Sequence, residues 1–392
     1  MTPVSPDDAL DELQETTQDQ IPPGAIYKLW GAGRRGGEYN GHIMFSMVMV
    51  GLAAAGVVSF SVFCWIMACL VAAFLLDNRT LKRKVSLSAL PGQAFLYVQL
   101  VLNAFRTAFP HYVFAFVTYL CVYPLQDKLN VSVSSLVMLY GFYMVLRIVY
   151  LTIFTYALTI GVDRVQLNVF SEQRANLRTR QVALRHVWWT YFLGNTGLFA
   201  KCSTQVMTIS AFEFLRRQIG LDVGTHPLFA PYVNWIAGLG VILCVIGIGL
   251  SLGMSGEVYY RAHRTLHVCK PLYDSIHAIH HRGILPTPLD SGTISPPEYF
   301  ITDMARPAYM LIPNWLFVLC EIGLAWAAHL PAHTTGTDSK VGGHHVGHHR
   351  YVVYNFGLMP EDDERWGTLF VPEETESPAE NAEAVSGAVS SV

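Results

Sequence analysis

Histidine is the residue type in this sequence whose spacing points most directly to chemistry. Eleven of the fifteen histidines lie between residues 263 and 349. Apart from His344, they form two H-x-x-x-H pairs and two H-x-x-H-H triplets, in the order His263/His267, His277/His280/His281, His329/His333 and His345/His348/His349. The other four, His42, His111, His186 and His226, are isolated in the sequence, and we interpret them as ordinary packed residues.

The spacing within the pairs and triplets indicates shared metal binding. Residues three or four apart lie on one face of a helix, with Cβ atoms about 5–6 Å apart. At that separation two imidazoles can bind one metal ion or flank two neighbouring ions. Keeping ten imidazoles neutral beside a membrane would be costly without a common partner. We therefore predict that the two pairs and the two triplets are metal ligands.

The number of histidines favours two ions. Imidazole binds zinc, iron, copper and nickel, so the ligand type alone leaves the metal open. A closed tetrahedral zinc site takes four ligands, fewer than the ten available. Two ions with about five ligands each would leave room for water or dioxygen, and paired metals can activate a small molecule jointly. No side chain besides the ligands is assigned a catalytic role.

The composition predicts a membrane protein. The chain is 52% hydrophobic and 14% charged, whereas soluble domains are about 25% charged. A net charge of −3 without a basic stripe makes nucleic acid an unexpected partner. A crossing needs about 20 apolar residues, and the apolar runs that we assign to the membrane are 43–76, 112–125, 136–160 and 228–254, with 187–213 as a weaker candidate.

The run at 308–328 has a different character. Pro307, Pro313 and Glu321 favour a re-entrant or protein-buried helix there. Histidines lie on both sides of this run, and a shared metal site requires them at one membrane face. The arginine-rich segment 163–186 predicts that this face is cytosolic, or the equivalent face of an organelle.

These patterns predict an all-α fold, a polytopic membrane helical bundle with a histidine-rich helical cap at one membrane face. We expect a polar N-terminal extension at 1–42, a transmembrane helical region at 43–254 and a di-metal domain at 255–372. Residues 373–392 are acidic and free of aromatic side chains, which predicts a disordered tail.

The motifs between 255 and 372 resemble those of the fatty acid hydroxylase/sterol desaturase superfamily. The segment YYRAHRTLHVCKPLYDSIHAIHH is similar to the first two histidine boxes of that superfamily. HVGHHRYVVYNFG is similar to its third box with the following Asn-aromatic-Gly, and DERWGTLF to its closing Asp-x-x-x-Gly-Thr. His329 and His333 occupy the place of additional ligands upstream of the third box, whereas Val346 stands where the superfamily often has aspartate.

The resemblance implies a membrane-bound oxygenase. Two irons, with zinc as a possible occupant, would activate dioxygen to hydroxylate or desaturate a fatty acyl chain or sterol, presented in an apolar tunnel partly formed by 228–254 and 308–328. Glu298, Asn355 and Asp363 are candidates for supporting the ligands, or are simply structural. The sequence has no His-Pro-Gly-Gly signature, so we expect no haem in this chain. Electrons would then come from a separate membrane donor, such as a cytochrome b5 or ferredoxin system.

Two other interpretations remain open. The chain could be a catalytically silent accessory subunit of a larger membrane complex that retains the fold and a metal. A metal transporter is less favoured, because the histidines follow the predicted spans rather than line them. The endoplasmic reticulum is the expected location, with the mitochondrial inner membrane as the alternative.

Overall fold

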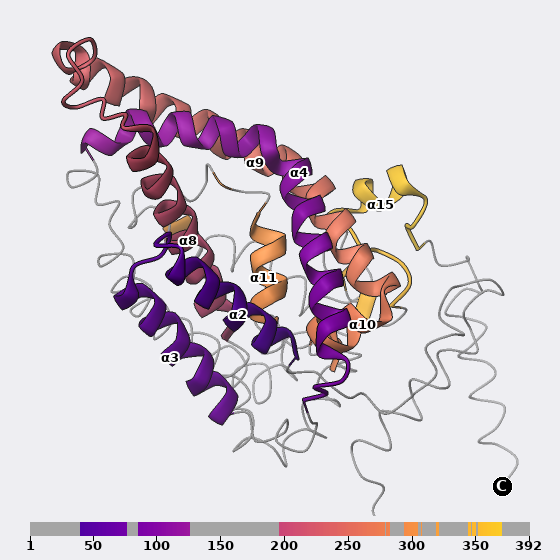
Figure 1. Ribbon diagram of the computed structural model, residues 1–392. Helices are drawn as coiled ribbons and strands as arrows, with labels where there is room; N and C mark the ends of the chain where they lie inside the picture. Colours follow the sequence, from indigo (N-terminus) through magenta and orange to yellow (C-terminus); the bar gives the residue numbers. More distant parts are fainter. Residues whose placement is uncertain are drawn as a thin grey trace, which may run out of the picture.

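The structure is a computed structural model that describes residues 40–76, 85–125, 196–278, 280–282, 294–304, 307, 319–320, 344–345, 347–349 and 352–370. Within these ranges all regular elements are helices and no strand occurs, which agrees with the predicted all-α class (Figure 1). Several predicted features lie outside the described residues: the extension before residue 40, the run at 136–160, the arginine-rich segment 163–186, His329, His333, nearly all of 308–328 and the tail.

The first apolar run forms two helices rather than one long one. They are α2 (Asn40–Ala54) and α3 (Phe60–Leu76), with 15 and 17 residues. Gly56, in the left-handed region with φ +71°, lies in the turn between them. Because glycine has no Cβ, it adopts this conformation without strain and allows the chain to reverse. Each helix is shorter than the roughly 20 residues that a crossing usually needs.

The two longest helices are α4 (Leu90–Val122) and α9 (Val233–Val268). The sequence predicted a membrane span that begins at residue 112, separate from the residues before it. That division is wrong, because α4 is continuous over 33 residues with Pro110 inside it. Pro110 removes one backbone donor and crowds the preceding turn, which bends a helix without necessarily ending it. Figure 1 shows α4 bending between its two ends.

Helices α4 and α9 run side by side over much of their length (Figure 1). Gly240 of α9 permits their close approach, since a Cβ there would lie 2.8 Å from the Cβ of Cys121 and from a methyl group of Val122. Together with the helical turn η6 (Ala230–Tyr232), they provide the two described segments that are long and apolar enough to cross a membrane, Leu90–Val122 and Ala230–Leu250. Their surfaces expose apolar side chains such as Leu102, Phe109 and Ile242.

Helix α8 (Thr196–Ile219) is held against α4 by a polar cluster at one end. Glu213 accepts hydrogen bonds from the hydroxyl of Tyr119 (2.8 Å) and from Arg216 (2.8 Å and 3.0 Å). The Arg216 guanidinium also lies 3.9 Å from the centre of the Tyr123 ring. The Glu213 carboxylate and the Arg216 guanidinium satisfy each other's hydrogen-bonding groups beside the apolar helices. We therefore interpret this cluster as a structural contact that joins α8 to α4.

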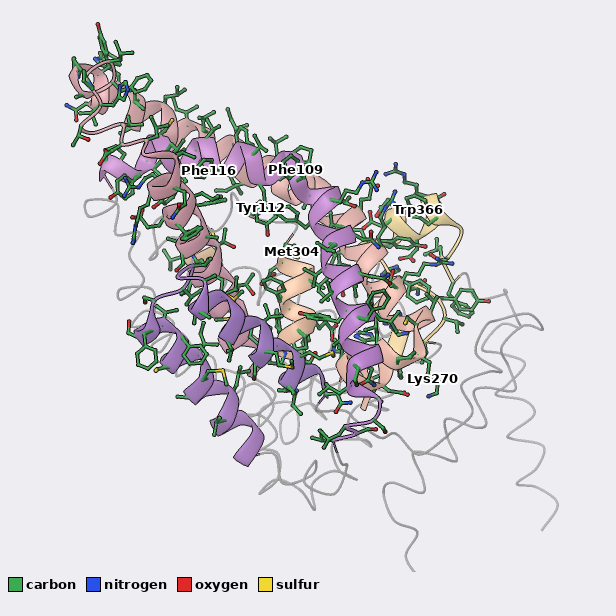
Figure 2. All side chains as sticks on the ribbon, in the orientation of Figure 1. Phe109, Tyr112, Phe116, Lys270, Met304 and Trp366 are labelled. Atoms are coloured by element: carbon green, nitrogen blue, oxygen red, sulfur yellow. The ribbon has the colours of Figure 1, made fainter. Side chains whose placement is uncertain are left out.

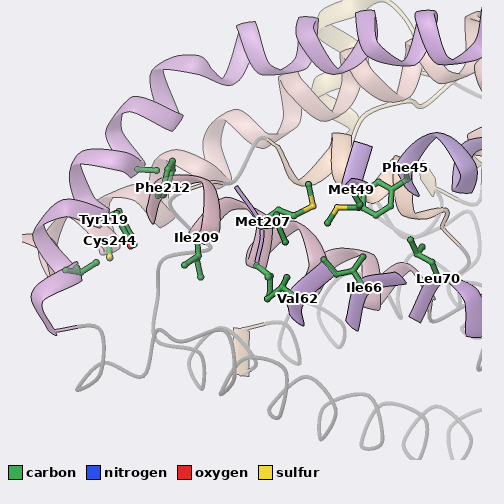
Figure 3. Close-up of a cluster of buried hydrophobic side chains, with 14 residues drawn as sticks. Phe45, Met49, Val62, Ile66, Leu70, Tyr119, Met207, Ile209, Phe212 and Cys244 are labelled. Carbon is green, nitrogen blue, oxygen red and sulfur yellow. The ribbon is translucent and has the colours of Figure 1, made fainter. Parts of the chain in front are cut away.

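Buried hydrophobic side chains form two clusters. The first joins α2, α3, α4, α8 and α9, and Figure 3 shows Met49, Ile66 and Met207 among its members. The second joins α4 and α9 to the short elements that carry the histidines, and includes Tyr97, Leu100, Leu266, Ile276 and Ile301. The second cluster is therefore the hydrophobic core beside the elements that carry the histidines.

Five short helices of the described residues lie at the histidine-rich end of the molecule, together with the end of α9. They are α10 (Lys270–Leu272), the π-helix η7 (Tyr273–His277), the 3₁₀ turn η8 (His280–Arg282), α11 (Pro296–Asp303) and α15 (Pro360–Trp366). Figure 2 places Lys270 and Trp366 at this end, whereas Phe109 and Phe116 lie farther along α4.

Side chains of α4 anchor these short elements. Gln93 donates a hydrogen bond to the carbonyl of Pro271 (3.2 Å), and the Tyr97 hydroxyl donates to the carbonyl of Pro297 (3.2 Å). At the start of α2, a Cβ on Gly41 would overlap the carbonyl oxygen of Ser275. Two long-range hydrogen bonds and one glycine contact thus fix the backbone that precedes His277 and Glu298.

Candidate metal centre

Eight of the ten predicted ligands converge in two groups of ring nitrogens, and the other two, His329 and His333, lie outside the described residues. Within each group the nitrogens lie within 4.8 Å of one another. The first group, the five-histidine group, comprises His263, His267, His277, His281 and His348. The second, the three-histidine group, comprises His280, His345 and His349.

Each H-x-x-H-H triplet contributes to both groups. In the triplet at 277–281, His277 and His281 belong to the five-histidine group and His280 to the other. The triplet at 345–349 does the reverse, giving only His348 to the five-histidine group. The groups are adjacent, since the ring centres of His281 and His349 lie 4.6 Å apart. The five-histidine group therefore requires the end of α9, the turns after it and the last histidine segment to fold together, whereas the three-histidine group requires only the last two of these.

Nε2 of His277 lies at the centre of the five-histidine group. It is 3.1 Å from Nε2 of His263, 2.8 Å from Nε2 of His267 and 2.9 Å from Nε2 of His281. Nε2 of His348 lies 3.1 Å from Nε2 of His281. The π-helix η7 widens the turn that ends at His277, and η8 contains a non-helical residue at His281. These irregular turns direct the Nε2 atoms of His277 and His281 toward each other within the five-histidine group.

The partners of the Nδ1 atoms fix the tautomers of two rings. Nδ1 of His263 lies 2.7 Å from the carbonyl of Phe356, and Nδ1 of His348 lies 2.7 Å from the carbonyl of Tyr354. A carbonyl only accepts hydrogen bonds, so both Nδ1 atoms carry the proton and both Nε2 atoms present a lone pair. Nδ1 of His277 lies 2.8 Å from Oε1 of Glu298, and an ionised Glu298 would accept the Nδ1 proton of His277.

This arrangement suits a metal cation. The Nε2 atoms of His263 and His277 are 3.1 Å apart, and with Glu298 ionised the partners of both rings place the protons on Nδ1. Two lone pairs at this distance repel each other unless a cation or a proton lies between them. Imidazoles whose other nitrogen donates to a carbonyl or carboxylate are also the usual form of a histidine ligand.

Burial keeps the imidazoles neutral. The five rings of the first group are buried, and burial lowers the pKa of His263 to about 4. Burial, followed by the neighbouring imidazoles, lowers the pKa values of His267, His277, His281 and His348 well below 6.5. A neutral imidazole has the free lone pair that a metal ion needs, so these residues are available as ligands at neutral pH.

Glu298 lies in the first turn of α11, directly behind His277. Ser295 caps this helix by accepting a weak hydrogen bond from the Glu298 amide (3.4 Å), and Pro296 follows the cap. Burial raises the pKa of Glu298 well above 4.5, and its Oε2 has no hydrogen-bond partner among the described residues. A divalent cation held by His277 would favour the ionised carboxylate. Glu298 therefore occupies the position of a carboxylate that orients a ligand.

Asn355 and Asp363 contact His344, the residue before the triplet at 345–349, without joining either group. Asp363 accepts a hydrogen bond from Nε2 of His344 (2.9 Å), and Asn355 donates to the carbonyl of His344 (3.0 Å). His344 was not predicted as a ligand, and its ring is used in this contact.

The backbone acceptors Tyr354 and Phe356 were missed by reasoning from the sequence, because a carbonyl has no residue-type signature. The Asn-Phe-Gly motif was the available signal for them.

The fold and the site together define a helical domain in which clustered histidines adjoin apolar helices long enough to cross a membrane. Residues 250–368 match the sequence model of the fatty acid hydroxylase family, which belongs to the fatty acid hydroxylase/sterol desaturase superfamily. The match confirms the resemblance predicted from the motifs. The comparison with curated proteins and the comparison with solved structures gave no match.

Proposed function

We propose that this protein is a membrane-bound di-iron oxygenase that hydroxylates or desaturates a lipid, using dioxygen and an external electron donor. The observation that carries the proposal is the convergence of eight histidines into two adjacent groups at the end of two long apolar helices. The match to the fatty acid hydroxylase family over the same residues supports it.

The chain would hold one ion in each histidine group. Two iron ions bound there would supply the reductive activation of dioxygen and the removal of hydrogen from an unactivated C–H bond. Zinc is the alternative occupant, because imidazole does not discriminate strongly between these metals. The protein's own contribution is to hold the rings as neutral ligands, through the Phe356 and Tyr354 carbonyls and Glu298, and to exclude bulk water by burial.

The position of the site favours a lipid substrate. His263 and His267 lie near the end of α9, beyond the apolar segment Ala230–Leu250. The second hydrophobic cluster lies beneath the histidines and continues along α4 and α9. The metal groups therefore adjoin apolar helices, and an acyl chain or sterol in a surrounding bilayer would lie next to the same helices. We further propose that the histidines face the cytosol, that the protein resides in the endoplasmic reticulum and that a separate membrane protein supplies electrons.

Comparing the lipids of cells with and without this chain tests the proposal. Cells lacking it, and cells expressing only the His280→Ala/His348→Ala variant, should lose the same hydroxylated or desaturated lipid. The double variant removes one ring from each group, and His226→Ala, remote from both groups, is the matched control that should restore the lipid.

Two results would contradict the oxygenase. Unchanged lipids in both the deletion and the double variant would favour the accessory-subunit interpretation. Fewer than one metal ion per purified wild-type chain would remove the basis for metal chemistry altogether.

A further inference from the structure

The segment that carries the Tyr354 and Phe356 carbonyls is held in an unusual conformation. Asn355, between the two carbonyls, has φ +59°, a left-handed value that few residues other than glycine adopt. This conformation turns both carbonyls toward the five-histidine group, where one accepts from His348 and the other from His263. A short stretch of backbone thus sets the proton position on one ring from the first histidine pair and one from the last triplet.

The Asn355 side chain holds this bend from two directions. Its amide nitrogen donates to the carbonyl of His344, and its carbonyl oxygen accepts from the amide of Phe370 (2.8 Å). Its own backbone amide donates to the carbonyl of Thr368 (2.9 Å). The bend is therefore attached both to His344, directly before the triplet at 345–349, and to the segment after α15.

Asp363 lies fully buried behind the bend and accepts four hydrogen bonds. Oδ1 accepts from the Phe356 amide (2.7 Å) and the Thr368 hydroxyl (2.7 Å). Oδ2 accepts from the Gly357 amide (2.7 Å) and from His344. Four donors around one side chain require an acceptor with two lone-pair-bearing oxygens, which a carboxylate provides.

The same carboxylate is connected to α9. The Thr368 hydroxyl uses its hydrogen on Asp363, so the Tyr260 hydroxyl must donate to the Thr368 oxygen (2.9 Å). Tyr260 is three residues before His263 on α9. Gly357 leaves room for these contacts, since a Cβ there would lie 2.7 Å from Oδ2 of Asp363.

We propose that Asp363 is a positioning residue for the metal centre and acts through the Phe356–Gly357 peptide. The Gly357 amide of this peptide donates to Oδ2 of Asp363, and its Phe356 carbonyl accepts the Nδ1 proton of His263. Asp363 thereby holds the carbonyls that keep the Nε2 lone pairs of His263 and His348 directed at the metal. This inference deepens the proposed function and depends on metal binding by the five-histidine group.

Asp363→Asn is the direct test, with cobalt(II) as the probe. The variant replaces one acceptor oxygen by an NH₂ group that faces two donors, so the backbone amide of Phe356 or Gly357 that faces it must move. We expect cobalt affinity, measured by chelator competition, to fall about 10- to 100-fold, the usual effect of losing a group that orients a ligand. We also expect the visible cobalt spectrum to change at equal occupancy, which simple loss of stability would not cause.

Glu364→Gln, an exposed acid on the same helix, is the matched control and should bind cobalt like the wild type. A folded Asp363→Asn variant with unchanged affinity and spectrum would overturn the inference while leaving the proposed function intact. A wild-type chain that binds less than one cobalt ion would overturn both. If Asp363→Asn does not fold, Asn355→Ala replaces it, because alanine is strained at φ +59° and loses both side-chain bonds. Unchanged cobalt binding in that variant would also overturn the inference.

Discussion

Among single residues, Glu298 has the most direct influence on a candidate ligand, because it contacts His277, the ring at the centre of the five-histidine group. Its Oε1 accepts from Nδ1 of His277 at 2.8 Å. Both residues are buried, so neither water nor a surface side chain can replace this contact. The carboxylate both orients the ring and raises the electron density at Nε2.

We expect Glu298→Gln to weaken metal binding about tenfold, at the lower end of the usual range for such groups. Glutamine keeps an oxygen that can accept from His277 but loses the negative charge, so Glu298→Ala should weaken binding further. Metal dissociation constants from chelator competition would check both. Equal affinities for wild type, Glu298→Gln and Glu298→Ala would contradict a role for Glu298 in the centre.

The lowered histidine pKa values predict how stability depends on pH. In the metal-free protein the buried rings resist protonation, with His263 titrating near pH 4, whereas unfolded histidines titrate near 6.5. Between these values the unfolded chain binds more protons, so stability falls as pH decreases from 6.5 toward 4. Each such proton contributes about 1.4 kcal/mol per pH unit.

Thermal unfolding of chelator-treated protein between pH 8 and pH 5 tests this expectation. Above pH 7 these rings should have little effect on the melting temperature. Below pH 6.5 the melting temperature should fall steadily as the pH decreases. His277→Ala should reduce the slope because it removes one buried ring. A melting temperature that rises on acidification would contradict neutral burial of these histidines.

Among the elements, the contact between α4 and α9 positions the site, because α9 carries two of the candidate ligands. We expect Gly240→Leu to destabilise the protein by about 1–3 kcal/mol, since its side chain would overlap Cys121 and Val122. Gly238→Leu is the matched control, because a Cβ at Gly238 meets nothing within 4 Å. Thermal unfolding in the same detergent would compare them. Equal losses in both variants would show that the close approach at Gly240 is unimportant.

The elements also show how far the sequence could predict this structure. Eight histidines that share triplet or pair spacing were correctly expected to converge, because periodicity reports which side chains share a helical face. The all-α class and the apolar character of α4 and α9 could also be predicted from the sequence.

Other features depend on tertiary contacts that periodicity does not record. Pro110 signals an end to a helix locally, yet α4 continues through it because its flanking turns pack against α9. The widened turn ending at His277 and the left-handed Asn355 likewise arise from contacts with residues distant in sequence.

For the whole molecule, the exposed apolar surfaces of α4 and α9 are suited to a bilayer as their solvent, because both helices contain a segment long and apolar enough to cross a membrane. Ile242 lies near the middle of Ala230–Leu250 and is 59% exposed. An aspartate at the centre of a crossing helix costs about 2.5–3.5 kcal/mol. We therefore expect Ile242→Asp to reduce the fraction of protein that resists alkaline extraction from membranes. Thr225→Asp, in an exposed turn before the helix, should have no effect.

An unchanged membrane fraction for Ile242→Asp would show that this face does not contact lipid. This face of α9 would then have to be covered by contact with other protein.

The sharing of each triplet between the two histidine groups has a consequence for how the protein acquires its ions. An ion in the five-histidine group would immobilise the turns that hold His277, His281 and His348, and those same turns carry all three rings of the other group. The first occupant thus removes much of the ordering cost for the second, which is positive coupling between neighbouring sites. Singly loaded chains should therefore be scarce at equilibrium, and a metal titration should rise sigmoidally from empty to doubly filled protein.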